Sequence, residues 1–103
     1  MPLLEICTTK YDDDIQSLKL EMNKLAAECN LDGGFQIGEP ISKFGWTFFE
    51  MFVQNDLYYG IEDKFSDLIK KCKGDKPIEK FVEFMIRYLD SRDCKVKIKL
   101  LSD

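Results

Sequence analysis

Hydrophobic and polar positions alternate near both ends of the chain in a pattern that predicts β-strands. Residues 3–8 place Leu4 and Ile6 on one side, as expected for a strand with one buried face. Residues 94–100 alternate more regularly, with lysine at every second position: Lys95, Lys97 and Lys99. Since successive side chains of a strand point to opposite faces, this segment predicts a strand that is buried on one face and solvated on the other.

Two more strands are predicted in the middle of the chain. Residues 35–41 alternate and contain Pro40, a residue typical of a strand end. The segment from Gly45 to Gln54 is the most apolar; it places Trp46, Phe48, Glu50 and Phe52 on one strand face and Thr47, Phe49, Met51 and Val53 on the other. A helical spacing over residues 44–52 is an alternative, but the aromatic content and the flanking glycine favour a strand.

Three helices are predicted by apolar positions that recur every three or four residues. The first carries Ile15, Leu18, Met22, Leu25 and Cys29, the second Leu57, Ile61, Phe65, Leu68 and Cys72, and the third Ile78, Phe81, Val82, Met85 and Leu89. Asp75 and Pro77 mark the start of the third helix. Asp13 and Gln16 fit a capping box, which predicts that Asp13 caps the first helix.

The elements follow in the order β-α-β-β-α-α-β within 103 residues, a length that suits a single compact domain over residues 1–103. This order predicts an α+β fold, an α/β two-layer sandwich that has an antiparallel sheet with helices on one face. It corresponds to a ferredoxin-like split β-α-β arrangement with an additional helix before the last strand. In such a fold each strand has one face under the helices and one open face, so Trp46, Phe48 and Phe52 face outward if Phe49 faces the helices.

Composition narrows the class of protein. The chain is 45% hydrophobic and 13% aromatic at a net charge of −4, which excludes disorder. No apolar run approaches the roughly 20 residues that cross a bilayer, and the N-terminus has no basic region followed by an apolar core. We therefore expect a cytoplasmic protein with no membrane partner.

Residue types that several chemistries require are missing. The four cysteines, Cys7, Cys29, Cys72 and Cys94, form no Cys-x-x-Cys pair, and the sequence has no histidine. We expect neither a metal site nor a cofactor, because the usual zinc ligands and the nucleotide-binding glycine patterns are absent. A Cys-His or Ser-His-Asp catalytic set is excluded for the same reason. Glu50, between Phe48 and Phe52, is the one carboxylate in an apolar setting, which leaves acid-base catalysis as an alternative.

Charge is distributed unevenly along the chain. Four basic and twelve acidic residues precede Lys64, whereas eleven basic and seven acidic residues lie from Lys64 onward. The acidic half can attract a basic partner, although solvated helix faces explain the same distribution. The lysines of the last strand are typical of a protected sheet edge. Since the whole chain is acidic, we expect no nucleic-acid partner.

These observations predict a small acidic non-enzymatic protein-binding module. The candidate partner-binding residues are Trp46, Phe48, Glu50, Phe52, Asp12, Asp13 and Asp14. The partner is either another protein or a second copy in a homodimer, since aromatic residues are enriched in the centres of protein interfaces. In size and acidity the chain is similar to inhibitors and immunity proteins of bacteria and phages. The alternatives are a dimeric ligand-sensing regulatory domain and an enzyme that uses Glu50 as an acid or base.

Overall fold

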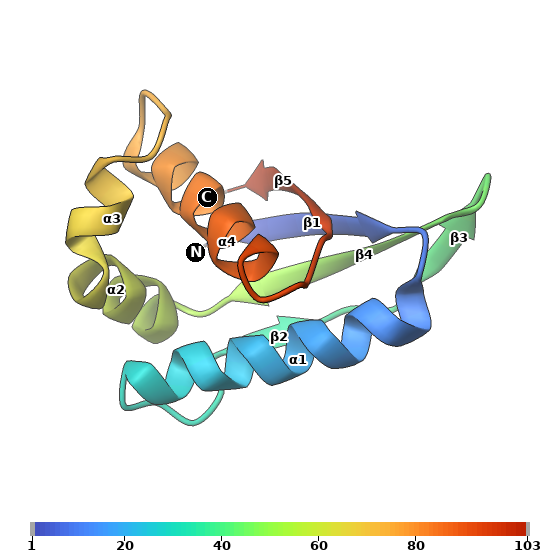
Figure 1. The fold of residues 1–103 in the computed structure, drawn as a ribbon, viewed down its shortest axis with the longest axis horizontal. Helices are drawn as coiled ribbons and strands as arrows, with labels where there is room; N and C mark the ends of the chain where they lie inside the picture. Colours follow the sequence, from blue (N-terminus) through green and yellow to red (C-terminus); the bar gives the residue numbers. More distant parts are fainter. Residues whose placement is uncertain (1, 103) are drawn as a thin grey trace.

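In the described part of the chain, five antiparallel strands and four helices make up the fold (Figure 1). The computed structural model describes residues 2–102. The elements are β1 (Leu3–Thr8), α1 (Tyr11–Glu28), β2 (Phe35–Ile37), β3 (Ile41–Lys43), β4 (Trp46–Val53), α2 (Asn55–Lys64), α3 (Ser66–Lys70), α4 (Pro77–Asp90) and β5 (Lys97–Ser102).

The sheet has the strand order β2-β4-β1-β5, and β3 pairs with β4 beyond the end of β2. Every strand pair is antiparallel. Helices α1 and α4 lie on the same side of the sheet, while α2 and α3 lie near one end of it (Figure 1). This is the arrangement of a ferredoxin-like α+β sandwich, and it confirms the fold class that the sequence predicts.

The hydrophobic core lies between the sheet and the helices. Its fully buried strand residues are Leu4 and Ile6 of β1 and Met51 and Val53 of β4; its fully buried helix residues include Leu18, Met22, Leu25, Leu57, Ile61, Phe81 and Met85. Each such side chain contributes about 1.5–3 kcal/mol relative to exposure. The apolar residues that predict the strands and those that predict the helices therefore pack together in one core. None of the helices in residues 2–102 is long and apolar enough to cross a membrane.

Two of the predicted elements are divided in the structure. The strand predicted over residues 35–41 is split into β2 and β3, because Gly38 still donates its N–H to the Glu50 carbonyl (2.8 Å) but Pro40 has no N–H to donate. The helix predicted over residues 57–72 is split into α2 and α3 at Phe65, whose φ of −113° departs from helical values. The ring of Phe65 packs there against Phe84, with 5.1 Å between the centroids.

The predicted cap of the first helix is wrong. Helix α1 begins at Tyr11, ahead of Asp13, and no side chain caps it. Instead, Thr8 at the end of β1 accepts the Lys10 N–H at 3.0 Å and donates its hydroxyl to the Asp14 carboxylate. Thr8 is 3% exposed, so the turn between β1 and α1 is fixed by a buried hydroxyl rather than by an aspartate cap.

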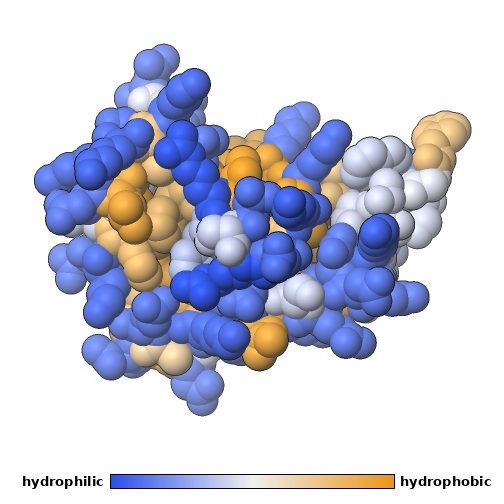
Figure 2. Space-filling view, in the orientation of Figure 1, coloured by the Kyte–Doolittle hydropathy of each residue, from blue (hydrophilic) through white to orange (hydrophobic). Residues whose placement is uncertain are grey.

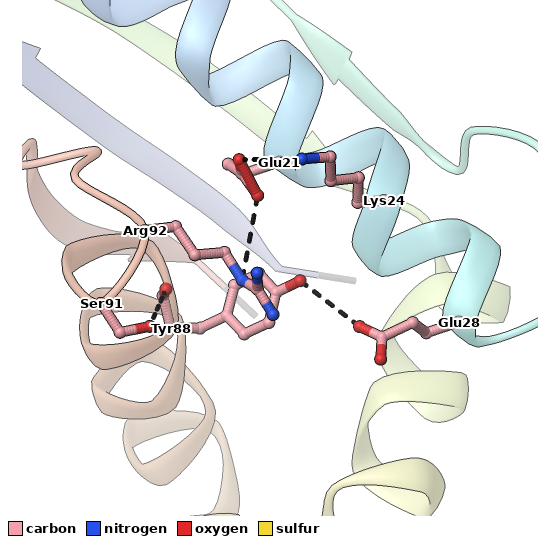
Figure 3. Close-up of polar contacts among 6 residues, drawn as sticks. All are labelled: Glu21, Lys24, Glu28, Tyr88, Ser91 and Arg92. Atoms are coloured by element: carbon pink, nitrogen blue, oxygen red, sulfur yellow. Dashed lines mark hydrogen bonds and ion pairs between the residues drawn. The ribbon is translucent and has the colours of Figure 1, made fainter.

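A buried carboxylate that the sequence pattern does not single out connects α1 to the end of α4 (Figure 3). Glu21 is 8% exposed, and its Oε1 lies 3.8 Å from Nε of Arg92. The Arg92 guanidinium lies 4.4 Å from the Tyr88 ring centroid, and the Tyr88 hydroxyl donates to Glu28 at 3.4 Å. These contacts fix α4 against α1 and hold the connection to β5, which carries part of the candidate site.

Candidate functional site

The sheet face opposite α1 and α4 is the candidate site, and we call it the open face. It is formed by Leu3, Glu5 and Cys7 of β1, Trp46, Phe48, Glu50 and Phe52 of β4, and Lys97 and Lys99 of β5. Phe49, Met51 and Val53 of β4 are buried under the helices, and strand alternation places the named residues on the other side. Four residues that the sequence analysis singled out thus lie together.

The aromatic side chains of the open face are half-buried. Trp46, Phe48 and Phe52 are neither sealed in the core nor fully exposed. The Nζ of Lys97 lies 4.8 Å from the centroid of the Trp46 ring, a cation–π contact that covers part of the indole. The face therefore offers ring surface that the helices of the same chain do not cover.

Two glutamates, Glu5 and Glu50, are cross-strand neighbours in the middle of the open face. The strand register pairs Glu5 of β1 with Glu50 of β4 on one side and with Lys99 of β5 on the other. Side chains paired in this way have Cβ atoms about 5 Å apart, and like charges at this spacing destabilise a sheet. Within residues 2–102, neither carboxylate takes part in an ion pair. Glu50 is exposed, so its charge is available to a partner.

The hairpin between β3 and β4 extends the candidate site beyond the sheet. Phe44 and Gly45 form its turn with φ values of 53° and 81°, and two positive φ values are typical of a type I′ turn, which favours Asn-Gly. Phe44 is 99% exposed, and Ile41, which pairs with Phe48, is 59% exposed. Figure 2 shows the hydrophobic tip of this hairpin at the upper right. Phe44 is a site residue that was not expected from the sequence; the Phe-Gly dipeptide between two strand patterns is the signal for it.

A cavity of about 320 Å³ opens at the edge of the open face, where β1 ends and β4 and β5 begin. Trp46, two lysines and two aspartates line it: Lys95, Lys97, Asp14 and Asp93. Both signs of charge are present, so the cavity can hold a small polar molecule against an aromatic ring.

The acidic residues at the start of α1 do not belong to the open face. Asp12, Asp13 and Asp14 form the first turn of the helix. Asp12 and Asp13 are exposed beside a hollow near β3, and Asp14 accepts the Thr8 hydroxyl. The structure therefore separates them from Glu50, and only Asp14 approaches Trp46, across the cavity.

The strand register determines which side chains lie beside Glu50. Its cross-strand neighbour on β1 is another carboxylate, Glu5. Burial, together with Asp14 and Glu21, raises the pKa of the Cys94 thiol to about 11, which keeps this sulfur protonated at neutral pH. Groups of three or more metal-binding side chains do not occur in the part of the chain that the structure describes.

Comparison of the chain with protein-family models, curated proteins and solved structures gives no match.

Proposed function

We propose that this chain is a non-enzymatic protein-binding module whose docking surface is the open face together with the Phe44 hairpin tip. The observation that carries the proposal is the cross-strand pairing of Glu5 with Glu50, which itself lies between Phe48 and Phe52 on β4. In the isolated chain this placement costs free energy. A partner that brings a cation to Glu50 turns part of this cost into binding energy.

The surroundings of the two carboxylates fit the centre of a protein interface. Phe48 and Phe52 flank Glu50 along β4, and aromatic residues are enriched where interfaces are fully desolvated. A charge that a partner covers in such a setting contributes strongly when it is paired and costs several kcal/mol when it is not. The open face therefore selects for a partner that presents both apolar groups and cations.

Phe44 supports the same function independently. A side chain other than glycine at a φ of 53° lies in the left-handed region, which costs roughly 1 kcal/mol. The ring gains nothing from the fold in return, since it is 99% exposed. Strained, solvated aromatic residues are typical of positions kept for binding.

A protein partner suits this face better than a nucleic acid. Glu5 and Glu50 occupy the middle of the sheet, where they oppose phosphate groups, and the whole chain carries a net charge of −4. Inhibitors and immunity proteins are one form that such a binding module takes.

The test compares variants that differ only in the face they change. Tagged wild-type protein, Glu50→Lys on the open face and Asp63→Lys on α2 are used as bait in the native cells, followed by affinity measurement with the purified captured protein. Glu50 and Asp63 are both exposed, and the two substitutions change the net charge by the same amount. We expect wild type and Asp63→Lys to bind equally and Glu50→Lys to bind at least about tenfold more weakly. Equal binding by all three places the interface elsewhere.

The cavity at the edge of the open face favours a second candidate, a ligand-sensing regulatory domain. Trp46 and Lys97 line the cavity and also belong to the open face, so a small polar ligand there would alter the docking surface. Trp46 is the only tryptophan of the chain. A metabolite that raises the melting temperature and also shifts tryptophan fluorescence supports this candidate, whereas a melting shift that Lys97→Gln leaves unchanged places the ligand elsewhere.

A further inference from the structure

We infer that the occupant of the open face is a second copy of this chain, related by a twofold axis that lies between the two sheets and runs parallel to β1. This inference rests on the proposed function and names its partner. The observations behind it are the strand order around β1 and the charges that the strand register places in each row of the sheet.

The strand order makes the open face self-complementary. Strand β1 lies between β4 and β5, so an axis along β1 keeps β1 over β1 and places β5 of each copy over β4 of the other. Each row of paired residues then faces the same row of the second copy in reverse order. The two rows that matter are Phe48, Cys7 and Lys97, and Glu50, Glu5 and Lys99.

The reversed rows bring opposite charges together. Lys99 of the second copy faces Glu50, and Lys97 of the second copy faces the ring of Phe48, which suits a cation–π contact. Symmetry makes each of these contacts twice. The two Glu5 carboxylates meet near the axis, and each has Lys99 of its own chain as its cross-strand neighbour. Sheets that pack about 10 Å apart leave these side chains within reach of one another.

The charge balance of the face agrees with this partner. The open face carries two carboxylates and two lysines, although the chain as a whole has a net charge of −4. The excess negative charge therefore lies elsewhere on the molecule. The open face as defined here has no net charge, so its approach to a second copy adds no net charge repulsion at the contact.

The size of the face predicts a reversible dimer. An eight-residue β4 is about 26 Å long, and the three strands that overlap, β4, β1 and β5, are about 14 Å wide. The resulting footprint of about 360 Å² per copy is below the roughly 800 Å² of a standard interface. Ile41 and Phe44 of the hairpin add to it. We expect a dissociation constant in the micromolar range rather than a permanent dimer.

Charge reversal on each side of the predicted contact provides the test. Glu50→Lys sets two ammonium groups against each other at this contact, and Lys99→Glu sets two carboxylates against each other. Both positions are exposed, so the fold tolerates the changes. Sedimentation velocity is measured from about 10 µM to about 1 mM for each variant alone and for an equimolar mixture. We expect each variant alone to associate about 100-fold more weakly than wild type and the mixture to restore association, because the mixed dimer relieves the like-charge contacts that each variant makes with itself.

Matched controls keep the result specific to the open face. Asp63→Lys on α2 and Lys19→Glu on α1 are exposed and change the net charge by the same amounts; we expect both to dimerise as wild type does. A wild-type protein that stays monomeric up to about 1 mM, or a dimer that neither reversal weakens, overturns the second-copy inference. The capture experiment with a heterologous partner is then read separately, so failure of this inference is distinguishable from failure of the proposed function.

Discussion

Glu5 and Glu50 lie directly opposite each other on β1 and β4, on the sheet face that no helix of the described chain covers. The pair combines residues that are far apart in the sequence, and neither carboxylate has an ion-pair partner among the described residues. Natural sheets avoid like charges at this spacing, because they lower stability. We interpret the pair as a binding determinant that the isolated fold tolerates at a cost.

Removal of one of these charges is expected to stabilise the monomer. Glu50→Gln should raise the free energy of unfolding by about 0.2–1 kcal/mol, with a smaller gain at high salt, because the repulsion from Glu5 is lost. Urea unfolding at protein concentrations below dimerisation measures this. Glu39→Gln, an exposed change outside the sheet, is the control and should have no effect. A loss of stability in Glu50→Gln shows that the pair is not repulsive.

Relief of strain at the hairpin tip is expected to separate stability from binding. Phe44→Asn should stabilise the chain by about 0.5–1 kcal/mol, because asparagine tolerates positive φ and Asn-Gly is the preferred type I′ sequence. The same variant should bind partners less tightly, since the exposed ring is lost. Unfolding and sedimentation of the one variant measure both effects. Destabilisation by Phe44→Asn would mean that the ring supports the fold.

The two sides of β4 are expected to differ in their energetic roles. Phe49→Ala, on the helix side at 2% exposure, should cost about 3–5 kcal/mol. Trp46→Ala and Phe48→Ala remove half-buried rings and should cost about 1–2 kcal/mol each while abolishing association. Thermal unfolding followed by circular dichroism measures whether Phe49→Ala loses more stability than Trp46→Ala and Phe48→Ala. If Trp46→Ala with Phe48→Ala unfolds the protein, the rings belong to the core.

Glu79 at the start of α4 is expected to give stability a dependence on acid pH. Its Oε1 accepts the N–H groups of Asp75 (2.8 Å) and Lys76 (3.2 Å), and these hydrogen bonds lower the pKa of the Glu79 carboxyl below its usual 4.5. Because the pKa is lower in the folded state, the ionised carboxylate stabilises the fold above about pH 4.5. This contribution is lost as the pH falls through the folded-state pKa. Unfolding of wild type and Glu79→Gln between about pH 6 and pH 2 measures it. We expect the difference between the two proteins to shrink towards low pH, and a constant difference contradicts the assignment.

Most of the fold can be predicted from the sequence, because apolar residues recur at every second position in the strands and at every third or fourth position in the helices. The alternation from Trp46 to Val53 correctly separates the buried side of β4 from its open side. The contact between Glu5 and Glu50 follows from the register of two distant strands, which local patterns do not specify. The ion pair of Glu21 with Arg92 likewise depends on how α1 and α4 pack. Asp12 and Asp13 were expected to share a surface with the aromatic segment only because the N-terminal half of the chain is acidic. The fold places them instead at the start of α1.

The most direct test of the open face uses a native cysteine at its centre. Cys7 lies between Phe48 and Lys97 in the sheet and is half-buried, so a docked partner covers its sulfur. The rate of Cys7 alkylation, followed by peptide mass spectrometry, should fall as wild-type protein is concentrated and should not change with concentration in Glu50→Lys. Association of the wild-type protein with no change in the Cys7 rate would contradict docking on this face.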